Sequence, residues 1–280
     1  MIKLDNKEVK QGHFPDGTLL VKYEQGYFPN ENVIEWNYEN DGELFTLICL
    51  VRHIKEHNAN SKIVLIMPYI PNARQDRVKS EEDIFTLKYF CEIINSLNFE
   101  KVLVTDAHSN VSLALLDRVQ SVSIDYNLHQ ALTKIVFAET GDVMHEHRME
   151  CYENLITFYP DEGAMKRYSS QLDFPYAFGI KDRDWKTGEI KGLKLANEEI
   201  IKGKTVLIID DICSKGGTFY YSAKALKAAG AANIYLYVTH CENTIHEGEL
   251  LKDNDLIKHI YTTDSILTVP HEKITTVNVK

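Results

Sequence analysis

One stretch of the chain, residues 205–218, restricts the possible folds more than any other segment. It reads TVLIIDDICSKGGT, an apolar and β-branched run that ends in Asp210 and Asp211 and leads into a loop rich in Gly and hydroxyl residues. A helical pattern over Phe219–Ala229 follows, so the segment predicts a strand, a loop and a helix. Such a loop presents backbone N–H groups beside a helix N-terminus, where a phosphate group binds readily.

The two acids before this loop indicate what accompanies the phosphate in the ligand. A carboxylate does not bind phosphate, but it accepts hydrogen bonds from sugar hydroxyls or holds a cation that a phosphate also binds. The segment therefore predicts a site for a sugar phosphate. An ordinary strand-to-helix turn with exposed acids would also fit, and we favour the site because buried strands seldom end in two unpaired carboxylates.

Two further apolar runs also end in polar side chains. Residues 62–69 (KIVLIMPY) are followed by four such side chains, Arg74, Gln75, Asp76 and Arg77. Residues 101–106 (KVLVTD) end in Asp106 and are followed shortly by His108. Ligands of open α/β sheets bind at the carboxyl ends of the strands, and guanidinium groups stack on bases and hold phosphate oxygens. A solvated ion-pair cluster would explain the first segment alone, but the second one favours a nucleotide site.

The length of 280 residues indicates two domains. We expect them at residues 1–126 and 127–280, with the last ten or so residues able to pack back on the first domain. Both halves repeat apolar strands that end in polar loops, with helices between them. This pattern predicts an α/β fold of two similar doubly wound parallel-sheet domains, with the site in the cleft between them.

Charge and composition exclude several classes of protein. A formal net charge of −10 argues against a nucleic-acid surface, which needs a basic stripe. No apolar run approaches the ~20 residues that span a bilayer, so we expect no membrane partner. The five cysteines are scattered and the first residues lack the apolar core of a signal peptide, which together predict reduced thiols and a cytoplasmic protein.

Taken together, these segments resemble the ribose-phosphate pyrophosphokinase family, also called phosphoribosyl pyrophosphate synthetases. PYIPNARQDR and VTDAHSN resemble the two ATP-site motifs of that family, and HFPDGTLLVKY (residues 13–23) resembles its adenine-binding turn, which a neighbouring subunit supplies. Residues 205–218 resemble its ribose-phosphate loop. The segments follow the family's order at about its spacing, so the resemblance covers most of the chain and implies domains of the phosphoribosyltransferase type.

The resemblance implies a role for each matching residue. ATP would be bound by Phe14, Asp16, Arg74, Gln75, Asp76, Arg77 and His108. The ribose phosphate would be bound by Asp210, Asp211, Ser214, Lys215, Gly216, Gly217 and Thr218. Lys181 and Arg183, two apart in a highly charged segment, would be the catalytic cations, and His108 and Asp161 would place Mg²⁺. We expect that segment, residues 180–192, to be a surface loop.

The implied reaction transfers the β,γ-pyrophosphate of ATP to the anomeric hydroxyl of ribose 5-phosphate, giving phosphoribosyl pyrophosphate and AMP. The family's phosphate loop reads Asp-Thr-Ala-Gly-Thr, whereas this chain has Ser214-Lys215-Gly216-Gly217-Thr218, so ADP-ribose is an alternative acceptor that would place the enzyme in NAD metabolism. A non-catalytic regulatory subunit of the synthetase type and a phosphoribosyltransferase are also compatible with parts of the pattern. The resemblance further implies a homo-oligomer, either a dimer or a hexamer.

Overall fold

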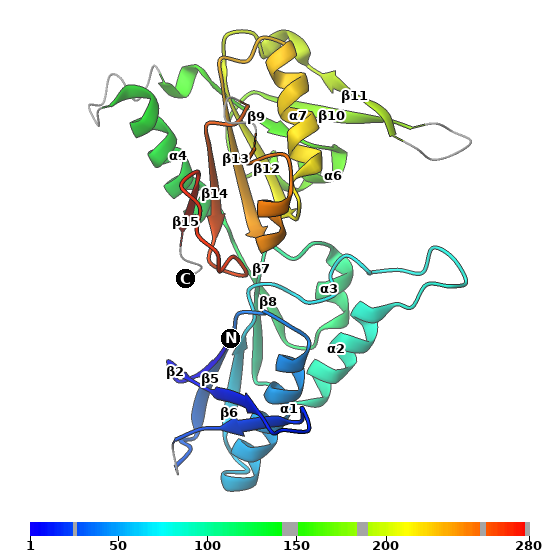
Figure 1. Cartoon of the computed structure of the whole chain (residues 1–280), viewed down its shortest axis with the longest axis vertical. Coiled ribbons are helices and arrows are strands. Elements are labelled where there is room, and N and C mark those ends of the chain that lie inside the picture. The colour runs from blue at the N-terminus through cyan, green and yellow to red at the C-terminus, as the bar shows by residue number, and fades with distance from the viewer. Residues whose placement is uncertain (25–26, 142–150, 184–189, 253–255, 278–280) are drawn as a thin grey trace. The chain divides into compact units, whose positions relative to one another are not determined.

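The protein is represented by a computed structural model, which describes residues 1–24, 27–141, 151–183, 190–252 and 256–277. The chain forms two compact units, Met1–Ser123 and Ile124–Lys280 (Figure 1). The boundary precedes the helix α4 (Asp125–Thr140), so this helix belongs whole to the second unit. Within the described residues, no helix is both long and apolar enough to cross a bilayer.

The first unit is a six-stranded sheet with the order β2-β1-β5-β6-β7-β8. Its strands are β1 (Ile2–Leu4), β2 (Lys7–Glu8), β5 (Glu31–Trp36), β6 (Lys62–Ile66), β7 (Lys101–Thr105) and β8 (Val119–Val122). The strands from β5 to β8 pair in parallel and in chain order. The helices are α1 (Gly42–His57), α2 (Thr86–Ser96) and α3 (Asn110–Leu115), and β3 (Lys10–His13) forms a separate hairpin with β4 (Leu19–Lys22).

Side chains on one face of the strands pack into the core of this unit. Alternate residues of β5, among them Ile34 and Trp36, are fully buried, while Val33 before them is 36% exposed. The period-two alternation of a strand explains this pattern. In α1, Leu47 and Ile54 lie two helical turns apart on one face, and both pack into the same core.

The second unit is a seven-stranded sheet with the order β11-β10-β9-β12-β13-β14-β15. Its strands are β9 (Leu155–Tyr159), β10 (Tyr176–Arg183), β11 (Ile190–Ala196), β12 (Thr205–Cys213), β13 (Asn233–Cys241), β14 (His259–Thr263) and β15 (Ile274–Val277). The helical elements besides α4 include α6 (Glu162–Tyr168), η1 (Glu198–Ile200), α7 (Gly217–Ala228) and η2 (Asn243–Glu247). All neighbouring strands of this sheet, as far as it is described, pair in parallel except β10 with β11.

This second sheet is covered on both faces. Val206 and Ile208 of β12 belong to one core, which includes residues of α7, whereas Leu207 and Ile209 belong to another, which includes residues of α4 and α6. Figure 1 shows α4 and α7 on opposite sides of the strands. A strand buried on both faces is expected to be apolar, as residues 206–209 (VLII) of β12 are.

The predicted α/β class with parallel-sheet domains is confirmed. One local expectation is corrected. Residues 180–183 and 190–192, which we expected in a surface loop, belong to β10 and β11, because their backbones pair in an antiparallel ladder. At the other end of the same sheet, the last described residues, Ile274–Val277, form the edge strand β15 through their pairing with β14.

Candidate functional site

The acidic end of β12 lies at the topological switch of the second sheet. The chain leaves β9 for β10 on one side, and β12 pairs with β9 on the other side. The connections of these two neighbouring strands run in opposite directions, which leaves a crevice outside their carboxyl ends. Open α/β sheets bind ligands in such a crevice. Asp161 follows β9, and Asp210 and Asp211 lie toward the end of β12. The three carboxylates predicted at separate sequence positions therefore share this edge.

Asp161 is the N-cap of α6. Its Oδ1 accepts hydrogen bonds from the backbone N–H groups of Gly163 at 3.0 Å and Ala164 at 3.1 Å. Such caps satisfy N–H groups that a helix leaves unpaired at its first turn. The residue that we expected to help place magnesium therefore also fixes the start of α6.

Asp211 is held from two sides. Its Oδ2 accepts a hydrogen bond from Arg167 Nη1 of α6 at 3.1 Å, and its Oδ1 accepts one from the Ile212 N–H at 2.8 Å. The Asp211 side chain is 8% exposed and that of Arg167 is 28% exposed. Asp211 is therefore an ion-paired carboxylate, which corrects the view of the two acids as unpaired.

Asp210 has the opposite electrostatic setting. Burial first, and then the charge of Asp211, raise the pKa of Asp210 well above its ordinary value, with a further contribution from Asp161. The Asp211 N–H donates a hydrogen bond to Asp210 Oδ1 at 3.0 Å and opposes this shift. The charged form of a carboxyl group in this setting is stabilised by a nearby cation or by hydroxyl groups that donate hydrogen bonds to it.

The predicted phosphate loop is a tight turn into α7. Gly216, its N-cap, has φ 77° and ψ 12°, in the left-handed region that Gly adopts most easily. A Cβ at this position would lie 2.9 Å from Leu250 Cδ2, and one at Gly248 would lie 1.8 Å from the carbonyl oxygen of Lys215. The two glycines thus allow the loop to pack closely against the segment after η2.

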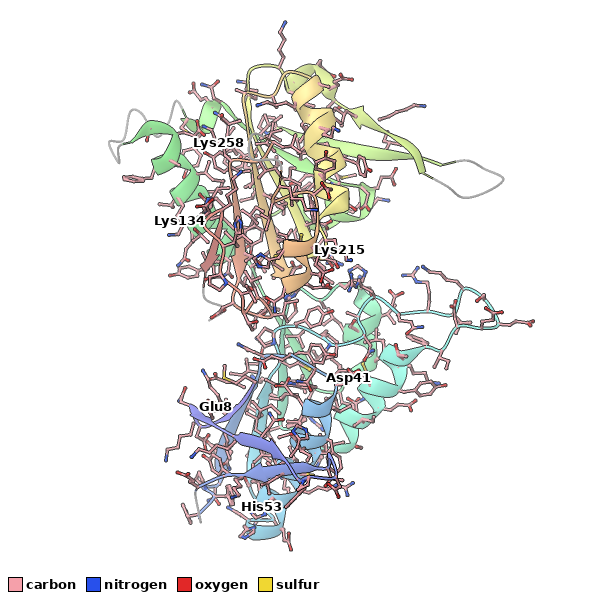
Figure 2. All side chains as sticks on the ribbon, viewed as in Figure 1. Glu8, Asp41, His53, Lys134, Lys215 and Lys258 are labelled. Atoms are coloured by element: carbon pink, nitrogen blue, oxygen red, sulfur yellow. The ribbon has the colours of Figure 1, made fainter. Side chains whose placement is uncertain are left out.

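Ser214 and Lys215, two residues that depart from the family pattern, are tied to that same region. Ser214 Oγ lies 3.1 Å from Thr244 Oγ1, which donates to Glu242 Oε2 at 3.0 Å. Lys215, labelled in Figure 2, forms an exposed ion pair with Glu247 at 2.9 Å. The cation gained in this loop is therefore partly balanced by an acid of η2.

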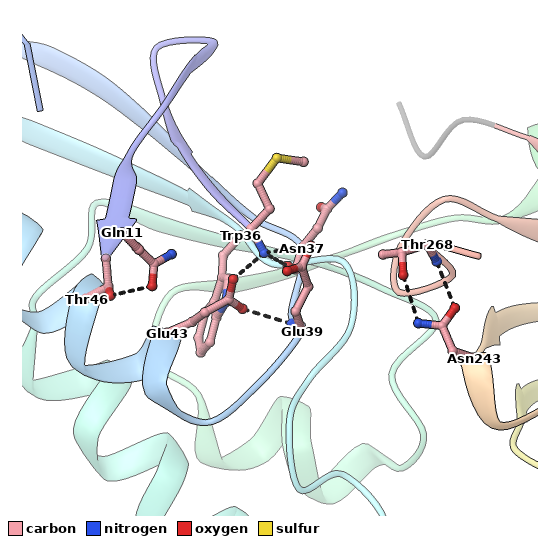
Figure 3. A network of polar contacts seen from close by, with 9 residues as sticks. Gln11, Trp36, Asn37, Glu39, Glu43, Thr46, Asn243 and Thr268 are labelled. Carbon is pink, nitrogen blue, oxygen red and sulfur yellow. Dashed lines mark hydrogen bonds and ion pairs between the residues drawn. The ribbon is translucent and has the colours of Figure 1, made fainter. Parts of the chain in front are cut away.

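The element η2 is anchored in turn. Asn243 Nδ2 donates to Thr268 Oγ1 at 2.8 Å, and Asn243 Oδ1 accepts from the Thr268 N–H at 3.0 Å (Figure 3). Asn243 Oδ1 also accepts from the Val269 N–H at 3.0 Å. Neither Asn243 nor Thr244 was predicted as a site residue. The only sign of them in the sequence is the polar strand end HCENT (residues 240–244), which carries no chemistry by itself.

In the first unit, the ARQDR and DAHSN segments lie close together. Asp76, 6% exposed, forms two hydrogen bonds with the Arg77 guanidinium, at 2.6 and 2.8 Å. This contact lowers the pKa of Asp76 to about 2, and the charge of His108 contributes to the shift. Gln75 Oε1 accepts a hydrogen bond from Thr86 Oγ1 at 2.6 Å, so α2 helps to place the segment. Arg74 is exposed in the same turn.

The hairpin of β3 and β4 carries the predicted adenine-binding turn at its tip. Phe14 is 50% exposed there, and Asp16 Oδ1 accepts hydrogen bonds from the N–H and hydroxyl of Thr18 at 2.9 and 2.7 Å. Those bonds lower the pKa of Asp16. Thr46 of α1 donates to Gln11 Oε1 of the hairpin at 2.9 Å (Figure 3), which fixes the hairpin on its own unit.

Lys181 and Arg183 lie at the end of β10, with Lys181 opposite Leu193 and an irregularity of pairing between Asp182 and Arg183. Their side chains lie outside the described part of the structure, as do residues 184–189. The catalytic role expected of these two cations thus stays a prediction.

The donor set suits a hard cation. Among the described residues, no group of three or more His, Cys, Asp or Glu side chains is arranged to hold a metal. Mg²⁺ needs no such group, because it binds through one or two carboxylates together with substrate phosphates and water. The carboxylates at the ends of β9 and β12 fit that requirement. The predicted anchors His108 and Asp161 belong to different units, and each is placed only within its own unit.

Comparisons with known proteins agree with the motifs. The phosphoribosyl transferase domain family matches residues 164–271, which include the acids of β12, the loop after them and α7. The ribose-phosphate pyrophosphokinase of Sulfurisphaera tokodaii is 27% identical over 277 residues, which cover 97% of this chain and 89% of that protein. The ribose-phosphate pyrophosphokinase of Sulfolobus acidocaldarius is 25% identical over 286 aligned positions, covering 100% and 89% of the two chains.

A solved structure supports the fold. The phosphoribosylpyrophosphate synthetase of Mycobacterium smegmatis matches with a TM-score of 0.74 over 97% of this chain and 86% of that chain, at 16% sequence identity. At that identity the likeness concerns the fold. The predicted resemblance is thus confirmed: the chain is similar over nearly its whole length to ribose-phosphate pyrophosphokinases, and its residues 164–271 match the phosphoribosyl transferase domain family.

Proposed function

We propose that this protein is a ribose-phosphate pyrophosphokinase, which transfers the β,γ-pyrophosphate of ATP to the anomeric hydroxyl of ribose 5-phosphate. The observation that carries the proposal is the edge of the second sheet, where Asp210 and Asp211 precede a Gly-rich loop at the N-terminus of α7. The acids suit ribose hydroxyls and the loop suits the 5-phosphate. The relatives over nearly the whole chain share this activity by name.

In the proposed reaction, the anomeric hydroxyl attacks the β-phosphorus and the bond to the oxygen of the α-phosphate breaks, so AMP leaves. Negative charge grows on the transferred group and on the leaving phosphate, and such chemistry depends on positioning and on cations. We assign Lys181 and Arg183 to stabilise that charge. Arg74, Gln75, Asp76, Arg77 and His108 would hold the nucleotide, and Ser214, Lys215, Gly216, Gly217 and Thr218 the acceptor phosphate.

Magnesium belongs to the proposal as the cation that neutralises the ATP phosphates. Asp161 and Asp210 are the side chains of the second unit that would hold it, and His108 is the one in the first unit. The raised pKa of Asp210 fits this role, because a bound cation favours its charged form.

Oligomer formation is a separate part of the proposal. The exposed Phe14 and the ordered Asp16 turn suit contact with a second copy's nucleotide. We expect a homo-oligomer, a dimer or a hexamer, in which this hairpin tip completes the ATP site of a neighbouring copy. Mixing inactive Phe14→Ala chains with inactive Lys181→Ala chains tests this: recovery of activity is expected, and its absence in a mixed oligomer contradicts it.

The first test is AMP release from Mg-ATP with ribose 5-phosphate, ADP-ribose or no acceptor. Turnover with ribose 5-phosphate is the expected result. Preference for ADP-ribose would mean that ADP-ribose is the acceptor and that Ser214 and Lys215 serve its binding. The enzyme would then act in NAD metabolism.

The variant Lys181→Ala separates a catalyst from a non-catalytic regulatory subunit. A catalyst loses most of its turnover, by about 100-fold or more if Lys181 stabilises transition-state charge. ATP binding, measured by calorimetry, is expected to persist. Activity that is unchanged in this variant would contradict the assigned role.

A further inference from the structure

Arg167 joins the two segments that carry the acids of the second unit. It lies in the last turn of α6, whose start is fixed by the Asp161 cap. From there it reaches Asp211 toward the end of β12, 44 residues farther along the chain, at 3.1 Å. One side chain thus links the segment after β9 to the end of β12.

The contact fixes the orientation of the Asp211 carboxylate. Arg167 holds Oδ2 and the Ile212 N–H holds Oδ1, so both oxygens are restrained by groups from different elements. The Asp210 side chain is a further neighbour of this carboxylate, and a carboxylate has about four acceptor positions, so the two bonds to Arg167 and the Ile212 N–H do not by themselves exclude hydroxyl donors. Because Asp211 is buried and Arg167 is partly exposed, the pair is screened less than a surface ion pair.

A surface pair on the same helix gives the contrast. Lys166, the preceding residue, pairs with Glu162 at 3.3 Å, and both side chains are more than 60% exposed. That pair is expected to contribute little. Arg167 instead lies over the ring of Tyr168, with 5.7 Å from Cζ to the ring centroid, and Tyr168 is fully buried. Its side chain is therefore packed as well as charged.

We propose that Arg167 is a positioning residue for the acceptor sugar, which holds Asp211 in the orientation that receives the ribose hydroxyls. This inference rests on the proposed function, since it assumes a ribose-phosphate acceptor. Arg167 itself touches no reacting atom. Its effect is expected on the binding of the sugar, and the binding of ATP should be unaffected.

The test compares Arg167→Gln, Arg167→Lys and the matched control Lys166→Gln. Arg167→Gln should raise the KM for ribose 5-phosphate by about 10- to 100-fold, as for a lost hydrogen bond to a charged group, with the KM for ATP within about twofold. Arg167→Lys should recover part of the loss, and Lys166→Gln should match the parent. The dissociation constant of ribose 5-phosphate, measured by calorimetry without ATP, should follow the same order.

A double-mutant cycle with Asp211→Asn adds a readout that a purely structural ion pair would not give. If Arg167 acts through Asp211, the two losses in sugar affinity are non-additive, and Arg167→Gln has little further effect in the Asp211→Asn protein. Equal KM values for ribose 5-phosphate in Arg167→Gln and parent, or fully additive losses, would overturn the inference. If the parent neither binds nor turns over ribose 5-phosphate, the proposed function fails instead.

Discussion

The two strand-end regions of this chain place their acids in opposite electrostatic settings. In the first unit, Asp76 is paired with the adjacent Arg77, and its pKa is lowered to about 2. In the second unit, the half-buried Asp210 lies beside other acids, and its pKa is raised. A region with its own cations suits an anionic nucleotide, whereas a region in which one acid, Asp210, lies beside further carboxylates suits sugar hydroxyls and a metal ion. In the proposed function, the same α/β layout thus serves two different binding tasks.

Removing the unbalanced acid should have the largest effect. We expect Asp210→Asn to lower kcat/KM by about 100-fold, because the amide keeps the shape but loses the charge that, in the proposed function, holds sugar and metal. The stability of the variant should be equal to or above that of the parent, since a buried amide needs less desolvation than a carboxylate. Steady-state kinetics and thermal unfolding check both parts.

The exposed Asp173 is the matched control, and Asp173→Asn should leave both quantities unchanged. An Asp210→Asn protein with parental activity would contradict the role given to the acidic edge.

The loops of the two regions differ in the space available to a side chain. In the first unit Asn72 has φ 63° and carries a side chain, whereas Gly216 in the second unit has φ 77° and a Cβ there would lie 2.9 Å from Leu250. We expect Gly216→Ala to lower the free energy of unfolding by about 1–3 kcal/mol. Urea unfolding measures this, with Asn72→Ala as the comparison. Equal losses in the two variants would mean that Leu250 can move aside.

The contributions of Asp76 and Asp210 to stability should change with pH in opposite directions. The pKa of Asp76 lies below its ordinary value of 3.8, so its contribution of about 1–2 kcal/mol is present above pH 4 and is lost as the pH falls toward 2. The pKa of Asp210 is raised, so stability is lost as the pH rises from about 4 through that higher value.

Urea unfolding of Asp76→Asn and Asp210→Asn over a pH series measures both effects. Asp76→Asn should differ from the parent mainly above pH 4, where it is less stable. Asp210→Asn should become more stable relative to the parent as the pH increases. If stability relative to the parent changed with pH in the same direction in both variants, the two acids would not have opposite electrostatic settings.

The smallest effect is expected at the loop cation. Lys215→Ala removes an exposed ion pair with Glu247 and should change stability by less than about 0.5 kcal/mol. The KM of this variant for ribose 5-phosphate shows whether Lys215 also contacts the substrate. A large loss of stability would show that this pair supports the loop.

The strand-end positions could be predicted from the sequence because each is marked locally. The run TVLIIDD indicates both a buried strand and its acids, and KIVLIMPY indicates the strand before ARQDR. Helix bounds were close for the same reason, as with α7, which begins at Gly217. These features depend on residues that are neighbours in the chain.

Contacts that join distant segments could not be predicted in this way. Arg167 and Asp211 are far apart in sequence, and an arginine in a short amphipathic helix carries no signal of its partner. The pairing of residues 190–192 with β10 was also hidden, because a charged segment poor in apolar residues has the composition of a loop. The opposite pKa shifts of Asp76 and Asp210 likewise depend on burial and on spatial neighbours.

The most direct test of the central claim is the structure of the products. Phosphorus NMR of Mg-ATP and ribose 5-phosphate with the purified protein should show AMP together with a diphosphate attached to the anomeric carbon of ribose 5-phosphate. That result requires attack at the β-phosphorus. Formation of ADP with a single transferred phosphate, or no new signal while both substrates bind, would contradict the account.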